Sequence, residues 1–177
     1  MPLQNPLPRH IAAFDEQIKR YHAQFSLPYD WRLLKAQLVA ESGLNPAATS
    51  PVGAKGLAQF MPGTWAEMLK ALKLPADTSP YNTDASIQCC AYYMSVLLNK
   101  WTAKREDIDR YCLALASYNG GTGNLLKAQK ASKGGKALGY GEIIPALPLI
   151  TGKSNAKQTT DYVQKILTEY LQMVFGL

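Results

Sequence analysis

The sequence predicts a mainly helical single domain, and three observations support this expectation. Apolar residues recur at spacings of three and four in most long segments, which is the pattern of helices with one buried face. The chain has 177 residues, 47% of them hydrophobic and 18% charged, which is typical of one globular domain with a normal core. No internal repeat and no second domain is visible. We therefore treat residues 1–177 as one domain.

The first two expected helices precede a loop rich in glycine and proline. Residues 1–26 are expected to form an N-terminal packing segment, with a helix from about Arg9 to Ser26. Its apolar stripe consists of Ile11, Phe14, Ile18, Tyr21 and Phe25. The second helix is expected from about Asp30 to Ser42, with Asp30 as its N-cap and Gly43 as the left-handed residue after its end.

Glu41 is the first candidate for chemistry. It shares one face of the second helix with Leu34 and Leu38, so it is expected on the apolar side. It also falls in the last turn, where the helix dipole disfavours a carboxylate. Burial and the dipole both favour the neutral acid, so we expect a raised pKa of Glu41, as a general acid requires. The alternative is a solvated glutamate at a frayed helix end.

The segment after Glu41 is expected to form one wall of a groove. It contains glycines at positions 53, 56 and 63 and prolines at 46, 51 and 62. Glycine lets the backbone approach a ligand closely, and proline fixes a loop that makes few helical hydrogen bonds.

Four further helices are expected before the C-terminal region. A short helix capped by Thr64 should end near Pro75, and a longer one should run from about Thr83 to Trp101. A run over 107–118 should end at Asn119-Gly120-Gly121, a break that can present backbone groups and the asparagine amide to a ligand. A short helix should follow from about Thr122 to Ser132.

The C-terminal region consists of a loop-like stretch and a closing helix. Residues 133–157 are rich in glycine, proline and lysine. The closing helix is expected from about Thr159 to Phe175, and Tyr162 should face inward from its first turn. Its apolar stripe consists of Tyr162, Ile166, Tyr170 and Val174.

Three separated motifs resemble those of the soluble lytic transglycosylase family, in the family's order. Residues 41–65, ESGLNPAATSPVGAKGLAQFMPGTW, resemble its first signature. Residues 116–123, ASYNGGTG, are similar to its Ala-Tyr-Asn-x-Gly motif, and residues 159–163, TTDYV, to its Glu-Thr-x-x-Tyr-Val motif. The resemblance covers roughly residues 26–172. It implies a lysozyme-like fold of the goose type, with helices around a sugar-binding groove.

Two weaker matches and three departures accompany these motifs. Residues 80–94 are similar to the family's Pro-x-x-Asn-Ile…Tyr-Leu stretch, and residues 144–148 to its Ile-Pro-x-Leu-Pro. Against the family pattern, residues 149–157 are an apparent insertion, expected as a loop on the groove rim. Ala58 stands where methionine is usual, and Gln158 where glutamate is usual.

The resemblance also implies roles for individual residues. Glu41 would be the sole catalytic acid and base. Ser50 would position the N-acetyl group of the substrate, while Gln59 and Met61 would line the sugar subsites. Asn119 would bind sugar, and Tyr118 and Tyr162 would flank the acid, with Tyr162 hydrogen-bonded to Glu41.

A single acid/base limits the reaction types. Glycoside hydrolysis ordinarily uses two carboxylates, but Asp77, Asp84, Asp107 and Asp161 occupy positions better explained by turns or helix starts. One carboxyl suffices if the 6-hydroxyl of N-acetylmuramic acid attacks its own anomeric carbon. This gives the 1,6-anhydro product of a lytic transglycosylase, which is the activity that the resemblance implies and the one we expect, with cleavage of the β-1,4 bond between N-acetylmuramic acid and N-acetylglucosamine. A hydrolytic lysozyme of the same fold and a non-catalytic wall-binding or virion structural protein remain alternatives.

Net charge and the numbers of cysteine and histidine residues limit the partners, the compartment and the cofactors that we expect. The net charge of +6 and pI of about 9.2 favour polyanions. The basic residues are scattered and no nucleic-acid motif accompanies them, so nucleic acid is not expected. The resemblance implies peptidoglycan glycan strands as the partner, and we expect a monomer. Three cysteines, two of them adjacent, are expected as buried thiols made in a reducing compartment. Two histidines are too few for a His-based metal site, zinc and nucleotide motifs are absent, and no metal or cofactor is expected.

No apolar window reaches the roughly 20 residues of a membrane-spanning helix, so stable membrane insertion is not expected. The first residues lack the features of a secretory signal. We therefore expect synthesis in a host cytoplasm and delivery to the wall through a pore or by a virion, as for a phage lysis enzyme. A bacterial enzyme exported by a specialised secretion machine is the other possibility.

Overall fold

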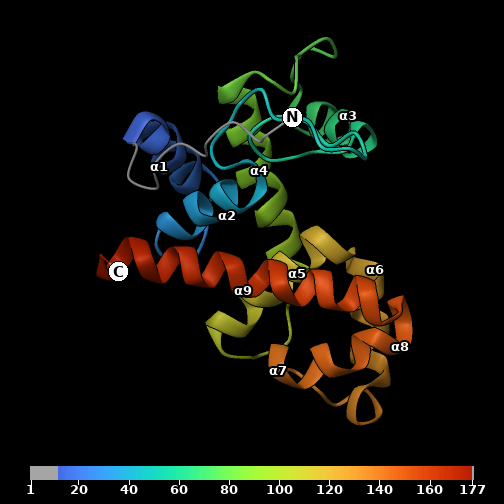
Figure 1. The fold of residues 1–177 in the computed structure, drawn as a ribbon. Helices are drawn as coiled ribbons and strands as arrows, with labels where there is room; N and C mark the ends of the chain where they lie inside the picture. Colours follow the sequence, from blue (N-terminus) through green and yellow to red (C-terminus); the bar gives the residue numbers. More distant parts are fainter. Residues whose placement is uncertain (1–11, 177) are drawn as a thin grey trace. The chain divides into compact units, whose positions relative to one another are not determined.

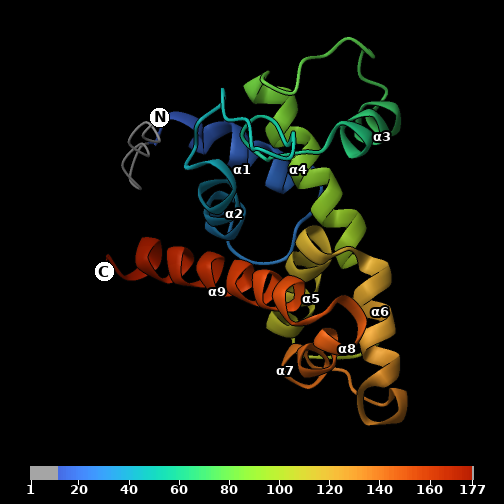
Figure 2. The same cartoon turned by 45° about the vertical axis from the view of Figure 1, so that its right-hand side comes forward.

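The computed structural model describes residues 12–176, and most of these residues are helical (Figures 1 and 2). In order, the helices are η1 (Ala12–Phe14), α1 (Asp15–Gln24), α2 (Arg32–Ser42), α3 (Pro62–Leu72), α4 (Thr83–Leu98), α5 (Asp107–Gly120), α6 (Thr122–Ala131), η2 (Ser132–Gly135), α7 (Tyr140–Ile143), η3 (Ile144–Ala146), α8 (Leu147–Thr151) and α9 (Lys153–Phe175). Extended pairing within this part of the chain is limited to isolated bridges of Lys55 with Thr49 and with Phe60. The mainly helical class expected from the sequence is confirmed.

The chain divides into two compact units, which we describe one at a time. The first unit comprises the chain up to Tyr93 together with the residues from Ile166 onward, and the second comprises Met94–Lys165. Helices α4 and α9 each contribute residues to both units. None of the helices in residues 12–176 combines the length and the apolar character that crossing a membrane requires.

In the first unit, α1 packs on α2 and is also tied to the start of α4. Ile18 of α1 and Leu34 of α2 are completely buried. Lys35, itself buried, forms a 2.6 Å ion pair with Asp15 across the two helices. The side chains of Arg20 and Tyr21 both bind the carboxylate of Asp84. These contacts hold α1 against both the helix that carries Glu41 and the start of α4.

In the second unit, α5 forms the centre of the core. Its residues 111–117 are all buried, and α6 packs both on α5 and on α8 (Figure 2). The indole N–H of Trp101 donates to the hydroxyl of Ser117 at 3.2 Å, and that hydroxyl donates to the carbonyl of Leu113 at 2.7 Å. The end of α5, where Asn119 lies, thus directly follows the buried part of the helix.

Of the helix boundaries around the first motif, the end of α2 agrees with the expectation from the sequence and the start of α3 differs from it. Gly43 is left-handed, with φ 64° and ψ 28°, as expected at the end of α2. Asp30 accepts the backbone N–H of Arg32 at 2.9 Å, although Trp31 lies between it and the helix. The expectation that Thr64 caps the next helix is wrong. α3 begins at Pro62, because the fixed φ of proline suits the first helical position.

The expected loop over residues 149–157 is also wrong, because this segment is mostly helical. It contains the end of α8 and the start of α9, separated by Gly152 at φ 80°. Ala156 is buried on the same side of α9 as Thr159 and Val163, so the packed face begins before the expected start of the helix. A polar sequence with a single small buried residue concealed this face. The insertion of this segment relative to the family stays a prediction. The single-domain boundary 1–177 also stays a prediction. Arg9 and Ile11, which were expected in the first helix, lie outside the described residues.

Candidate active site

Glu41 lies in the last turn of α2 and is half-buried. Leu34 and Leu38, on the same helix face, are completely buried. Directly after it, the N–H of Gly43 bonds to the carbonyl of Val39 at 2.8 Å, and the chain turns sharply into the loop. The position of Glu41 beside the core is therefore as expected, and the raised pKa of its carboxyl stays a prediction.

The loop from Gly43 to Met61 is fixed by its own backbone hydrogen bonds. Lys55 and Phe60 exchange two N–H···O bonds, of 3.0 and 3.2 Å, and the N–H of Gly56 donates to the carbonyl of Ala48 at 2.9 Å. Within this frame the hydroxyl oxygen of Ser50 accepts the N–H of Ala54 at 2.9 Å. Since a serine hydroxyl is both an acceptor and a single donor, the O–H of Ser50 is still able to donate to a ligand.

Gly56 shows why this loop requires glycine. Its φ is +76°, and a Cβ at this position would lie 2.0 Å from the carbonyl oxygen of Pro80. Any side chain would therefore collide with backbone and would also strain φ. The close approach ties the loop to the segment that leads into α4.

Gln59 supports the loop through one end of its amide. Its Nε2 donates to the carbonyls of Gly56, at 2.9 Å, and of Ala48, at 3.3 Å. Both partners are acceptors, so the nitrogen must face them and the amide oxygen must face elsewhere. Met61 follows at the N-terminus of α3 and is 45% exposed. Ala58, a departure from the family pattern, is completely buried, and its N–H donates to the hydroxyl of Ser86 at 3.3 Å.

The other three candidate residues lie in the second unit. Tyr118, half-buried, and Asn119, exposed, are in the last turn of α5, and Tyr162 is half-buried on α9. The hydroxyl of Thr159 donates to the side-chain oxygen of Asn119 at 3.0 Å. This bond joins the second and third motifs, and Tyr162 follows Thr159 by one helical turn.

Thr159 fixes the side chain of Asn119, a contact that the sequence did not indicate. It is 2% exposed and lies against Gly120, where a Cβ would come within 2.8 Å of its hydroxyl oxygen. Because the Thr159 hydroxyl donates to the amide oxygen of Asn119, it fixes the orientation of that amide. The NH₂ group of Asn119 can then donate to a ligand. Forty residues separate the partners, so no local pattern indicates the contact.

The structure explains the candidate second carboxylates as structural groups. Asp84 is in the first turn of α4 and binds Arg20 and Tyr21. Asp107 is the first residue of α5, and Asp77 lies in the turn closed by the N–H of Thr78. The expectation that Asp161 lies at a helix start is wrong, because α9 begins at Lys153. The carboxylate of Asp161 pairs with Lys157 at 2.5 Å. Across residues 12–176, no three His, Cys, Asp or Glu side chains gather as metal ligands would.

Solved structures with a similar fold include lytic transglycosylases. An inactive mutant of the lytic transglycosylase Slt from Pseudomonas aeruginosa is 25% identical, with a TM-score of 0.71 over 90% of this chain and 24% of that one. The 70 kDa soluble lytic transglycosylase of Escherichia coli is 24% identical, with a TM-score of 0.70 over 93% of this chain and 25% of that one. The fold is therefore lysozyme-like, as the motifs implied.

Residues 18–138 match the family model described as the transglycosylase SLT domain. The chain therefore belongs to the SLT transglycosylase domain family. Among similar curated proteins is the membrane-bound lytic murein transglycosylase F of Pectobacterium atrosepticum, 32% identical over 155 residues, which are 85% of this chain and 31% of the relative. The protein of the same name from Vibrio vulnificus is 27% identical over 98% of this chain and 32% of its own length. The chain thus spans about a third of these relatives.

Proposed function

We propose that this protein is a peptidoglycan lytic transglycosylase that cleaves the β-1,4 bond between N-acetylmuramic acid and N-acetylglucosamine, with Glu41 as its only acid/base. The observation that carries the proposal is the place of Glu41: half-buried in the last turn of α2, within a family-matched segment. A carboxyl beside the core and at the negative end of a helix dipole favours its neutral form, as a general acid requires.

The proposed reaction uses the same carboxyl twice. Glu41 first gives its proton to the glycosidic oxygen, and the bond from that oxygen to the anomeric carbon of the muramic acid breaks. The N-acetyl oxygen of the same sugar assists this departure. Glu41, now a carboxylate, then takes the proton of the 6-hydroxyl while that oxygen bonds to the anomeric carbon. Glu41 ends protonated, no water is consumed, and the product is the 1,6-anhydro sugar.

The loop of the first unit offers groups that suit the proposed sugar contacts. The O–H of Ser50 is suited to donate to an N-acetyl carbonyl. The amide oxygen of Gln59, turned away from its two backbone partners, is suited to accept from a sugar hydroxyl. The exposed thioether of Met61 is flexible and apolar, which suits contact with the face of a sugar ring.

The second unit supplies the remaining proposed contacts. We assign the NH₂ group of Asn119 to a sugar oxygen, because Thr159 already occupies its amide oxygen. Tyr118 and Tyr162 are proposed to flank the acid, with the hydroxyl of Tyr162 bonded to Glu41. These roles rest on the matched motifs.

Delivery from a cytoplasm through a pore or by a virion is a separate proposal. The relatives reported above are bacterial, and by name membrane-bound, so they give the phage origin no support. Monomeric state and the exclusion of nucleic acid likewise stay predictions.

Product analysis tests the reaction type. Purified cell wall is digested with the protein, and the soluble fragments are weighed by mass spectrometry. Fragments ending in anhydromuramic acid, each lighter by one water than the hydrolysed form, are expected. Fragments ending in reducing muramic acid would instead establish a hydrolytic lysozyme.

Substitution of the acid tests the site. Glu41→Gln keeps the size of the side chain but cannot give and retake a proton. We expect the rate of wall clearance to fall by roughly 100-fold or more. Glu67→Gln is the matched control, since Glu67 is an exposed residue of α3. Unchanged clearance with a folded Glu41→Gln protein would refute Glu41 as the acid, whereas no clearance by the unmodified protein would favour a non-catalytic wall-binding role.

A further inference from the structure

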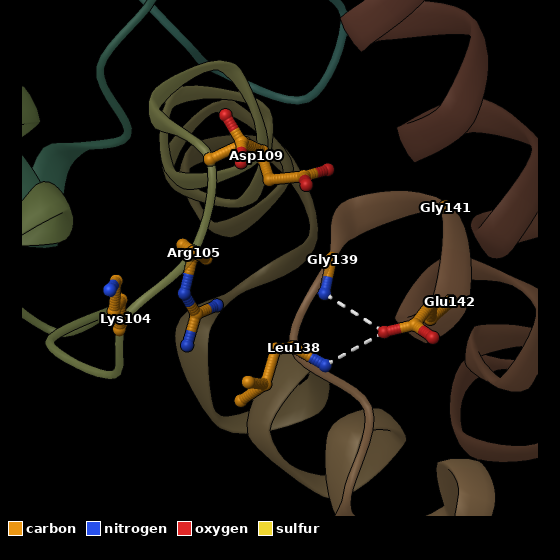
Figure 3. Close-up of a pocket in the computed structure, with 8 residues that line it drawn as sticks. Lys104, Arg105, Asp109, Leu138, Gly139, Gly141 and Glu142 are labelled. Carbon is orange, nitrogen blue, oxygen red and sulfur yellow. Dashed lines mark hydrogen bonds between the residues drawn. The ribbon is translucent and has the colours of Figure 1, made fainter.

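A hollow of about 450 Å³ in the second unit carries charged groups that the proposed reaction does not use (Figure 3). It is lined by Lys104, Arg105, Glu106, Asp109, Leu138, Gly139, Gly141 and Glu142. None of these residues belongs to the three motifs that carry the family resemblance. The volume is within the range of sites for small ligands.

The carboxylate of Glu142 is already engaged by the protein itself. One oxygen accepts the N–H groups of Leu138, at 3.1 Å, and Gly139, at 3.2 Å, as Figure 3 shows. The other pairs with Lys133. The lysine and the two N–H groups lower the pKa of Glu142 to about 2. Both oxygens of this carboxylate therefore bind groups of the protein itself.

Asp109 is engaged in the same way. Its Oδ1 accepts the N–H of Tyr140 at 2.8 Å, and a Cβ on Gly139 would lie 3.1 Å from its other oxygen. Asp109 therefore fastens the start of α7 to α5. Of the three acids that line the hollow, only Glu106 has a carboxylate without a hydrogen bond or ion pair to another described residue, and it lies exposed before α5.

The cations of the hollow, in contrast, have unused donors. The guanidinium of Arg105 lies over the ring of Trp101 at 5.2 Å, and its Nε donates to the carbonyl of Ala103 at 3.1 Å. Its Nη1 is buried and has no acceptor among the described residues. Lys104 is exposed and forms no ion pair with a described carboxylate. Figure 3 shows Arg105 between Lys104 and Leu138.

Arg110 places a further cation near Arg105, although the lining itself holds two cations and three carboxylates. Its Nε is also buried with no acceptor among the described residues. Burial, and then the like charge of Arg110, lower the pKa of Arg105, while Asp109 acts in the opposite direction. Buried guanidinium N–H groups without acceptors are costly, and an oxyanion is the ligand that a guanidinium fork binds best. Leu138, 39% exposed, adds an apolar wall.

We propose that this hollow binds the free carboxylate at the end of a short peptide, with Arg105 and Lys104 holding the carboxylate and Leu138 contacting the adjacent small side chain. The inference rests on the proposed function for the source of the peptide, because peptidoglycan strands carry short peptides that end in carboxylates. Binding there would hold the peptide arm of the glycan.

The test uses the Glu41→Gln protein, so that binding is measured without cleavage. Acetyl-D-alanyl-D-alanine, its C-terminal amide and inorganic phosphate are each titrated while the indole signal of Trp101 and the amide signal of Leu138 are followed by NMR. We expect the acid to shift both signals and to bind roughly tenfold or more tightly than the amide, since a charge-assisted hydrogen bond is lost in the amide. Equal binding of acid and amide would overturn the proposal.

Phosphate separates a peptide site from a general oxyanion site. If phosphate shifts the same signals at the same concentration as the peptide, the peptide source is overturned and the hollow is a plain anion site. Weaker binding of phosphate is expected, because it makes no contact with Leu138.

Variants test the residues named. Arg105→Gln and Lys104→Glu should each weaken binding of the acid roughly tenfold, and Lys130→Glu, at an exposed position of α6, should not. Should Arg105→Gln unfold because it loses its contact with Trp101, Lys104→Glu decides alone: unchanged binding would refute the assignment. A protein that binds the peptide but never degrades wall would refute the proposed function and leave this site standing.

Discussion

At the scale of single residues, the bond between Thr159 and Asn119 makes a testable claim about sugar binding. Thr159→Val keeps the shape of the side chain but frees the amide of Asn119 to rotate. We expect a loss of about 1 kcal/mol in the free energy of unfolding and a several-fold rise in KM for wall fragments, with a smaller change in kcat. Steady-state kinetics and urea unfolding measure these effects.

Two further substitutions serve as controls for that prediction. Thr159→Ser retains a hydroxyl and should restore KM. Thr160→Val removes the neighbouring hydroxyl, which donates to the carbonyl of Ala156 in the same helix at 2.9 Å, and should leave KM unchanged. A rise in KM with Thr160→Val as large as with Thr159→Val would mean that the hydroxyl of Thr159 has no special role.

Two glycines of the loop from Gly43 to Met61, Gly53 and Gly56, separate steric from conformational effects. Both have positive φ, but a Cβ on Gly56 would lie 2.0 Å from the carbonyl of Pro80, whereas a Cβ on Gly53 would meet nothing within 4 Å. Gly53→Ala should cost about 1 kcal/mol from backbone strain alone. Gly56→Ala should cost about 3 kcal/mol or more, because backbone must move. Thermal unfolding of both variants compares them, and equal losses would contradict this account.

At the scale of elements, the sequence predicted what local signals encode. The end of α2 was predictable because Gly43 combines with an apolar stripe that stops there, and this fixed the position of Glu41. The start of α9 was not, because Ala156 is one small residue in a polar run. The contacts of Thr159 with Asn119 and of Gly56 with Pro80 were beyond a sequence pattern, since they join elements far apart in the chain.

The segment from Leu138 to Glu142 should be sensitive to acid. The pKa of Glu142 is lowered from 4.5 to about 2, first by Lys133 and then by the N–H groups of Leu138 and Gly139. A lowered pKa means that the ionised group stabilises the folded segment above its ordinary pKa, and that this contribution is lost as the pH falls from about 5 towards 2. We expect the amides of Leu138 and Gly139 to lose protection from hydrogen exchange over that window. In Glu142→Gln the protection should be low throughout, and a pH dependence unchanged by this substitution would exclude Glu142 as its cause.

At the scale of the whole molecule, the charge is divided unequally between the two units. Eleven of the nineteen basic residues and five of the thirteen acidic residues lie within residues 94–165, so the formal net charge of +6 belongs to the second unit. The first unit has eight of each sign. An anionic polymer is therefore attracted mainly through the second unit, and this attraction weakens as salt screens it.

Charge reversal in each unit tests this division. Lys127→Glu with Lys130→Glu, at exposed positions of α6, lowers the net charge by four, and Lys70→Glu with Lys73→Glu, at the end of α3, lowers it equally. At low ionic strength the first pair should slow wall degradation several-fold, and the second should have much less effect. At about 0.5 M salt, where the screening length falls to only a few ångströms, both should approach the unmodified protein. Equal slowing by the two pairs would show that only total charge matters, because the substitutions differ in the unit that carries them and not in the charge they remove.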